Sequence, residues 1–154
     1  MVADALPFLP LSLRLWCVTQ LEEGSCGGAL ATEEAAHERA SPLGPKARAH
    51  FDACERRRAI LYVPAAVMWE CGLLARVVRI NLRRSLREFF EDLFSNPAYQ
   101  PVEISPAHVL LADELRFTRD PFDGLIVAVA RDLGLPLVTR DSMIRESGSV
   151  KVIW

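Results

Sequence analysis

Three acidic residues, Glu70, Asp123 and Asp141, stand in the sequence where a carboxylate could do chemistry. No histidine, cysteine or serine arrangement of the kind used in nucleophilic catalysis lies near them. A set of carboxylates suits a hard cation such as Mg²⁺ or Mn²⁺. Such an ion polarises a phosphoryl oxygen and generates hydroxide from bound water, so the three acids together indicate phosphodiester hydrolysis.

Glu70 lies among apolar neighbours, in the early part of a predicted helix that begins at Pro64. An ionised carboxylate in such surroundings is costly unless it is paired or bound to a metal. The positive end of the helix dipole also favours an anion near this position. The alternative is that Glu70 lies on the polar stripe of an amphipathic helix and contacts only water.

Two aspartates occur at the predicted start of a later helix. Asp120 precedes Pro121, which is the pattern of an N-cap followed by proline at the first helical position. Asp123 falls where the acid of a capping box would lie, so both aspartates have a structural interpretation. An apolar helix follows Asp123, which could face a cleft instead. We therefore assign Asp120 as a cap or a residue supporting the ligands, and Asp123 as a candidate ligand.

Asp141 directly follows the predicted strand Leu135–Thr139 and Arg140. Open α/β sheets place their ligands beyond the carboxyl ends of parallel strands, which favours a role in the site. A helix N-cap or a turn is the alternative interpretation of this aspartate.

A basic stretch without acids follows Glu70. Its spacings of three and four predict that much of the set shares one helical face, which could follow a phosphate backbone. The alternative is a solvated face beside a turn. The five arginines are Arg76, Arg79, Arg83, Arg84 and Arg87.

The length of 154 residues fits one domain that buries a core without disulfides. The net charge of −2 neither indicates nor excludes a nucleic-acid partner. Cys54 and Cys71 lie in apolar helical patterns and are interpreted as small core residues. The apolar run Ala5–Trp16 is interrupted and too short to span a bilayer, so we expect a cytoplasmic protein without a membrane partner.

The chain divides near residue 45. Residues 1–44 form an atypical N-terminal segment, expected to be poorly ordered, in which Leu11–Val18 is the best candidate for a strand. From residue 45 to 154, predicted helices and strands alternate, which favours an α/β fold with a parallel sheet flanked by helices. The predicted helices are 45–58, 64–78, 82–94, 105–116 and 121–133, and the predicted strands are 59–63, 102–104, 135–139 and 150–153.

Three sequence blocks resemble the PIN-domain ribonuclease toxins of the VapC type. The segment Val63–Glu70 is similar to the family's strand–helix junction, which supplies a metal-binding glutamate. Arg119–Ala128 resembles its R-D-P-F-D-R-x-L-I-A block, and Leu135–Asp141 resembles its L-x-L-V-T-R-D block. The closing Val150–Trp154 is similar to its last strand, and the order and spacing of the blocks agree as well.

This resemblance implies a PIN-like three-layer fold, in which acidic residues surround one or two divalent ions. It implies cleavage of RNA by a toxin that a cognate antitoxin neutralises, and a homodimer in many members. Carried over by position, Glu70, Asp123 and Asp141 would be the metal ligands and catalytic carboxylates, with Mg²⁺ or Mn²⁺ as the cofactor.

Two departures from the family pattern concern the site. Gly124 stands where the family has arginine after its second aspartate. The family also begins with a hydrophobic strand ending in a central metal-binding aspartate, whereas residues 1–44 contain only Asp4, with no strand leading into it. One hypothesis is that the segment before Ser41 is out of frame or misassigned, which the other frames of the coding DNA would test.

The sequence therefore leaves three interpretations open. The first is a Mg²⁺-dependent endoribonuclease toxin. The second is a catalytically impaired or inactive PIN-like protein that binds an antitoxin or RNA without cleaving it. The third is an α/β domain without nuclease function whose acids all act as caps, which does not explain Glu70 within an apolar segment.

Overall fold

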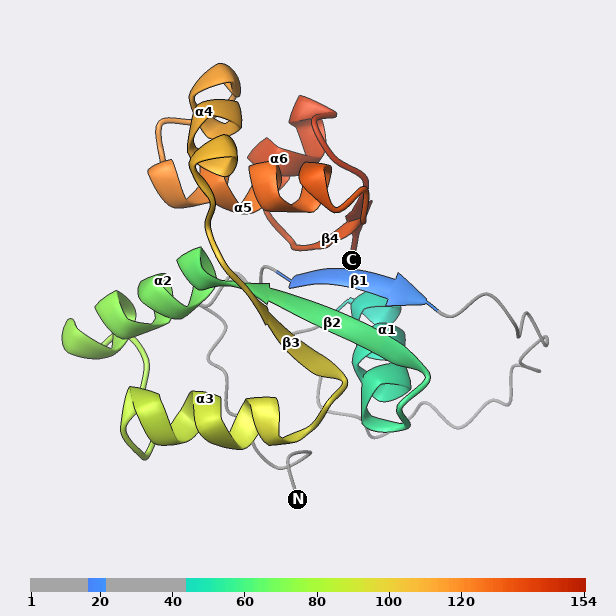
Figure 1. Cartoon of the computed structure of the whole chain (residues 1–154), viewed down its shortest axis with the longest axis vertical. Coiled ribbons are helices and arrows are strands. Elements are labelled where there is room, and N and C mark those ends of the chain that lie inside the picture. The colour runs from blue at the N-terminus through green and yellow to red at the C-terminus, as the bar shows by residue number, and fades with distance from the viewer. Residues whose placement is uncertain (1–16, 22–43) are drawn as a thin grey trace.

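The computed structural model describes residues 17–21 and 44–154. These residues form helices on both faces of one five-stranded sheet (Figure 1). The strands are β1 Cys17–Leu21, β2 Ala59–Pro64, β3 Tyr99–Val102, β4 Leu137–Val138 and β5 Val152–Ile153. The helices are α1 Pro45–Glu55, α2 Ala65–Arg76, α3 Leu86–Ser95, α4 Pro106–Glu114, α5 Pro121–Asp132 and α6 Ser142–Ser147. The α/β class expected from the alternation is confirmed.

The sheet has the strand order β3-β2-β1-β4-β5. β2 pairs parallel with β3, and β4 pairs parallel with β5. β1 runs antiparallel to both of its neighbours, with Val18 opposite Tyr62 and Cys17 opposite Val138. Because β2 and β4 are both antiparallel to β1, these two strands run in the same direction. All four strands after residue 45 therefore point the same way, and their carboxyl ends meet at one edge of the sheet.

The direction of β1 differs from the expected all-parallel sheet. β1 also lies later in the chain than the strand predicted from the sequence, Leu11–Val18. The two segments share only Cys17 and Val18. Residues 11–16 lie outside the described part of the chain. The segment Cys-Val-Thr-Gln-Leu has only a weak alternation of apolar and polar residues. Register and direction are poorly specified where one face of a strand is not clearly apolar, so the sequence did not determine how β1 pairs.

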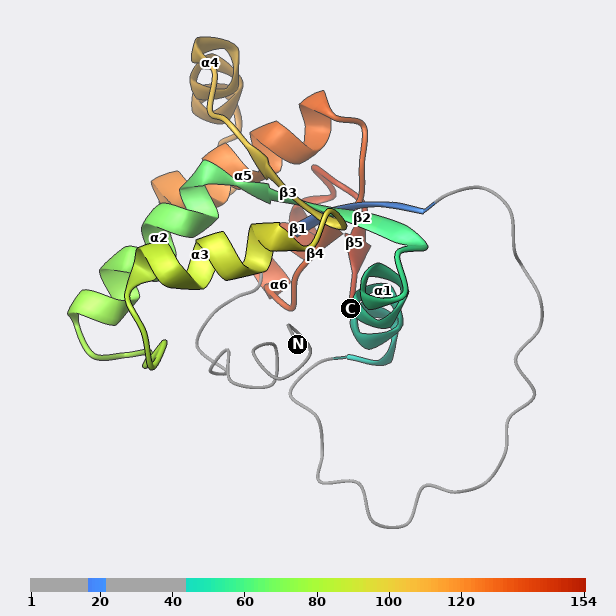
Figure 2. The same cartoon turned by 60° about the horizontal axis from the view of Figure 1, so that its bottom comes forward.

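The core lies between the sheet and its helices. α1 and α3 lie on one side of the sheet, and α4 and α5 lie on the other (Figures 1 and 2). Cys54 and Cys71 are buried, as expected, and so is Ala47 of α1. The largest fully buried side chains belong to β2, β3, α5, β4 and α6 and include Tyr99, Leu61, Ile126, Leu137 and Ile144.

α4 and α5 form an antiparallel pair that is joined at both ends. At one end, the Nε2 atom of His108 lies 3.1 Å from Oδ2 of Asp132. The backbone N–H of Ser105 donates to Nδ1 of His108 at 3.0 Å, so that the ring proton belongs on Nε2 and is donated to Asp132. At the other end, Gly124 packs against Ala112. Position 124, where the resembling family has arginine, is thus a helix–helix contact in this chain.

We expect Gly124→Ala to stabilise the protein. A Cβ atom at this position would lie 3.5 Å from the carbonyl oxygen of Ala112 and 3.6 Å from its Cβ atom, which is ordinary contact. Alanine in a helix interior is favoured over glycine by about 0.5–1 kcal/mol. Urea unfolding should therefore show a free energy of unfolding that is higher by about this amount, with an unchanged m-value.

Gly44→Ala is the matched control. A Cβ atom at residue 44 would lie 2.5 Å from the backbone carbonyl carbon of Trp154, so the alanine has to displace the chain. Overpacking of this kind typically costs about 1–3 kcal/mol. A Gly124→Ala variant that unfolds as readily as Gly44→Ala would contradict the close but unstrained contact between α4 and α5.

Candidate functional site

The tripeptide Thr-Arg-Asp occurs twice, and each copy builds the same turn before a helix. In the first copy, the backbone N–H of Asp120 donates to Oγ1 of Thr118 at 3.0 Å. In the second, the N–H of Asp141 donates to Oγ1 of Thr139 at 3.1 Å. Hydroxyl side chains that accept from a backbone N–H two residues later are a recurrent turn device. Thr118 and Thr139 were not singled out from the sequence, although the repeated tripeptide would have revealed them.

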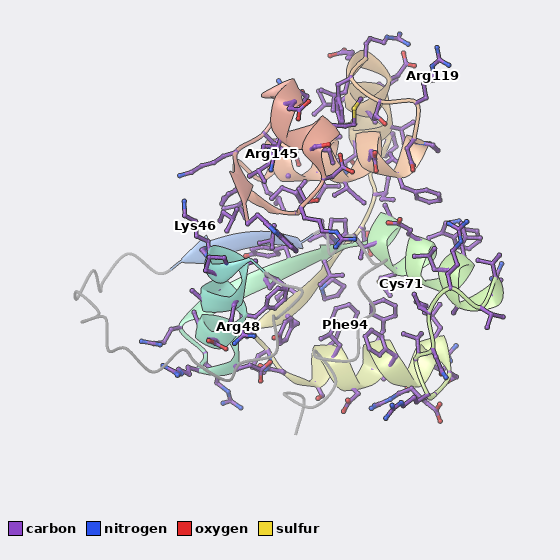
Figure 3. All side chains as sticks on the ribbon, turned by 180° about the vertical axis from the view of Figure 1, so that it is seen from behind. Lys46, Arg48, Cys71, Phe94, Arg119 and Arg145 are labelled. Atoms are coloured by element: carbon purple, nitrogen blue, oxygen red, sulfur yellow. The ribbon has the colours of Figure 1, made fainter. Side chains whose placement is uncertain are left out.

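Asp120 is the N-cap of α5. Its Oδ1 accepts a hydrogen bond from the backbone N–H of Phe122 at 2.9 Å, and its side chain is exposed. Arg119 of the same turn points away from the sheet (Figure 3). Asp120 therefore fastens the start of the helix and faces solvent.

Asp123 lies one turn further and is buried, with 4% of its surface exposed. It does not complete a capping box with Asp120, because the N–H of Asp120 is bonded to Thr118 instead. The hydroxyl of Thr118 donates to Oδ2 of Asp123 at 3.2 Å. This hydrogen bond holds the carboxyl group in place in the first turn of α5.

Asp141 is buried as well, with 7% of its surface exposed. It is the N-cap of α6, and its Oδ1 accepts from the backbone N–H of Ile144 at 3.2 Å. Thr139, whose hydroxyl holds the turn, is completely buried. The aspartate thus lies just beyond the carboxyl end of β4, where the sequence predicted it.

Glu70 lies in the middle of α2 and is half-buried, with its Oε2 atom fully buried. The neighbouring thiol of Cys71, on the side of α2 seen in Figure 3, is 2% exposed. Burial raises the pKa of Cys71 from 9.0 to about 12, and the charge of Glu70 contributes to the increase. Glu70 therefore adjoins the low-dielectric interior, as the apolar segment around it suggested.

The topology directs the three acids to the same edge of the sheet. α2 begins at the carboxyl end of β2, and Asp141 follows the carboxyl end of β4. α5 packs against α2, and its first turns, which include Asp123, lie beside α2 in both views (Figures 1 and 2). β1, between β2 and β4, presents its first residue, Cys17, at this edge and contains no acidic residue.

The chemistry of these donors fits a divalent cation, because carboxylate oxygens are the ligands that Mg²⁺ and Mn²⁺ prefer. The three carboxylates are not close enough together in the structure to form a metal site by themselves. Within residues 17–21 and 44–154, no group of three or more His, Cys, Asp or Glu side chains lies close enough together to hold a metal ion.

The arginines do not share one helical face. Arg76 is the last residue of α2, Arg87 lies in the first turn of α3, and Arg79, Arg83 and Arg84 lie in the connection between these helices. The expected helix 82–94 begins only at Leu86, because Ser85 forms a capping box with Glu88. All five side chains remain exposed, around one helix–turn–helix corner.

Comparison with known proteins identifies the family. The PIN domain model matches residues 39–148, which is more than half of the chain, and the chain belongs to the PIN domain family. PIN domains act on nucleic acid as nucleases and generally depend on divalent metal ions. No curated protein and no solved structure matches the chain. In the part of the chain that the structure describes, no helix is long and apolar enough to cross a membrane.

The raised pKa of Cys71 predicts a stability change at alkaline pH. Between pH 9 and about pH 12 the thiol ionises in the unfolded chain but stays protonated in the folded one. The unfolded state then binds fewer protons, so the free energy of unfolding falls as pH rises, by up to about 1.4 kcal/mol per pH unit. Cys71→Ala lacks this contribution, and its stability should fall less steeply above pH 9 in urea unfolding.

Comparison of the two proteins at each pH cancels the contribution of Cys54, whose pKa burial raises to about 11 in both. Below pH 8 the difference between wild type and Cys71→Ala should be constant. Parallel curves up to pH 11 would mean that the thiol is not held in an apolar environment.

Proposed function

We propose that this PIN domain is a Mg²⁺- or Mn²⁺-dependent endoribonuclease of the VapC toxin type, with Glu70, Asp123 and Asp141 as its catalytic and metal-binding carboxylates. The observation that carries the proposal is the burial of Asp123 and Asp141 at 4% and 7% exposure, on two turns directed to the same sheet edge as Glu70. Carboxylates are rarely buried this deeply, and buried acidic groups with defined hydrogen bonds concentrate at functional centres.

Each residue of the proposed site has a defined task. The hydroxyl of Thr118 holds Oδ2 of Asp123, and the backbone N–H of Ile144 holds Oδ1 of Asp141, so both carboxylates are oriented before a ligand arrives. Glu70 enters from α2. The ion, when bound, would polarise the scissile phosphate and supply a hydroxide nucleophile. RNA is the proposed substrate.

The biological context follows from the same family type. A cognate antitoxin would neutralise the enzyme, a homodimer would be its assembly, and the cytoplasm would be its place of action. These three statements rest on the resemblance of the Glu70, Asp123 and Asp141 blocks.

Asp123→Asn should abolish cleavage. Asparagine keeps an oxygen that accepts from Thr118, so the variant is expected to fold, but it removes the negative charge. Loss of one charged ligand should cost at least about 100-fold in rate, since each factor of ten is 1.36 kcal/mol of transition-state stabilisation. The measurement is cleavage of a structured RNA in Mg²⁺, with EDTA as the metal-free reference.

Asp113→Asn is the control for this experiment. Asp113 is exposed on α4 and pairs with Arg116 at the surface, so the same chemical change there should leave cleavage unchanged. Equal rates for wild type and Asp123→Asn would remove Asp123 from the site. Cleavage that persists in EDTA would overturn the metal dependence.

A second candidate function is binding of RNA or antitoxin without cleavage. The central strand favours it, because Cys17–Leu21 brings no acid to the edge, and no three potential ligands gather within the described residues. This candidate predicts weak metal binding by a set that lacks a central carboxylate.

A titration of stability with Mg²⁺ separates the two candidates. A nuclease site should raise the free energy of unfolding with metal concentration, by about 2.7 kcal/mol when Mg²⁺ is at 100 times its dissociation constant. Glu70→Gln should abolish the increase, whereas Glu114→Gln on the exposed side of α4 should not. Stability that is independent of Mg²⁺ in all three proteins would favour the binding protein.

A further inference from the structure

His108 is a buried titratable side chain that the proposed nuclease site does not use. It lies in the first turn of α4, and 6% of its surface is exposed. Histidine is the side chain whose charge ordinarily changes between about pH 5 and 8, so the contacts of its two ring nitrogens determine how this part of the fold responds to acid. Both nitrogens are engaged, one at the start of α4 and one with α5.

The ring of His108 takes the place of the acid in a capping box. Ser105 is the N-cap of α4, and its Oγ accepts from the backbone N–H of His108 at 3.3 Å. In return, the backbone N–H of Ser105 donates to Nδ1 of His108 at 3.0 Å. Glutamate or glutamine usually supplies this second acceptor, as Glu88 does for Ser85 at the start of α3. The cap of α4 therefore rests on an imidazole nitrogen where that of α3 rests on a carboxylate.

The cap of α4 requires a neutral imidazole. A ring nitrogen accepts a hydrogen bond only while it carries no proton, whereas the imidazolium ion has two donors and no acceptor. Protonation of His108 would turn Nδ1 from an acceptor into a donor that faces the N–H of Ser105. Rotation of the ring does not help, because neither nitrogen of the charged ring can accept. The complete capping box is thus incompatible with a charged His108.

Asp132 engages the other ring nitrogen and does not replace the lost acceptor. Nε2 of His108 lies 3.1 Å from Oδ2 of Asp132, and it donates to this oxygen whether or not the ring is charged. The side chain of Asp132 is 61% exposed, so water screens the extra attraction to a charged ring. The contact with α5 can therefore persist in both charge states, whereas the hydrogen bond at Ser105 cannot.

Asp132 is the charged side chain of α5 that contacts the ring. α4 packs against α5, so the other charged residues of both helices and of the segment before α4 are relevant as well. These residues are Glu103, Asp113, Glu114, Asp123 and Arg131. Asp123 is buried at the opposite end of α5, and the others are exposed to solvent. The response of the α4 cap to acid is therefore determined by His108 together with Asp132.

We propose that His108 makes the start of α4 sensitive to acid: protonation of its ring opens the capping box with Ser105, while Nε2 stays on Asp132. The N–H of Ser105 then loses its acceptor and exchanges with water. α4 remains joined to α5 at its other end, where Gly124 packs against Ala112. This device is a property of the fold and does not depend on the proposed nuclease activity.

The test measures amide hydrogen exchange by NMR on the ¹⁵N-labelled full chain. Protection of the Ser105 amide, relative to the exchange rate of an unstructured chain at the same pH, should fall from about pH 7.5 to about pH 5.5, on either side of the ordinary histidine value near 6.5. The fall should be up to about tenfold per pH unit, because opening takes up at most one proton. The ¹⁵N signals of the His108 ring report its protonation over the same range.

His108→Gln is the matched variant. Glutamine is a usual residue at this position of a capping box, and its side-chain oxygen accepts from Ser105 without titrating. Protection of the Ser105 amide in this variant should be the same at both pH values. The Ser85 amide is an internal control in wild type, because it donates to the carboxylate of Glu88 at 2.9 Å. Side-chain and backbone hydrogen bonds from Ser85 hold the pKa of Glu88 below its ordinary value, so this cap stays closed at the lower pH.

Constant protection of the Ser105 amide in wild type overturns the proposal, whether or not the ring takes up a proton. A loss of equal size in His108→Gln overturns it as well, since that loss would not need a titrating ring. So does an equal loss at Ser85 and Ser105, which would mean that acid destabilises the chain as a whole. The comparison of these two serine amides within wild type remains decisive even if His108→Gln does not fold.

Discussion

The burial of two aspartates at the starts of helices is the constraint on which the rest of this domain depends. Asp123 and Asp141 are almost completely removed from water, and an unsupported carboxylate there would be expensive. Each is supported by local hydrogen bonds, from the hydroxyl of Thr118 and from the N–H of Ile144. These supports come from the turns and helices that carry the acids, so local segments contribute to holding both carboxylates in place.

The central strand β1 contributes to the fold but brings no acidic residue to the candidate site. The strands after residue 45 share one direction, and β2 and β4 bring α2 and Asp141 to the same edge. A strand at the centre is still needed, because it pairs with both β2 and β4 and joins the two halves of the sheet. Cys17–Leu21 meets this requirement by pairing with both neighbours in the antiparallel direction. The centre of the sheet is thus filled by a strand that adds no charge to the site.

The sequence predicted those features that local chemistry determines. The Asp120-Pro121 pair predicted the start of α5. The alternation of helical and strand patterns after residue 45 predicted the order of the elements in that part of the chain. The sequence did not predict features that depend on contacts between distant segments, or features that use an unusual residue type. α2 ends at Arg76 although no glycine marks the end, because Val78 adopts a left-handed φ of 58° that a β-branched residue rarely takes. The direction of β1 depends on pairing with residues of β2 that lie 38 to 44 positions away, which no short window of the sequence contains.

The pairing of α4 with α5 holds the helix that carries Asp123 in a defined position. His108 and Asp132 join the start of α4 to the end of α5, and Ala112 and Gly124 join the opposite ends. α5 is therefore fixed at two separated points, which restricts its rotation about its own axis. Gly124 directly follows Asp123, so the contact between the two helices lies next to the residue that carries the carboxylate. The glycine that departs from the family pattern thus belongs to the packing of α4 against α5, where alanine would also fit.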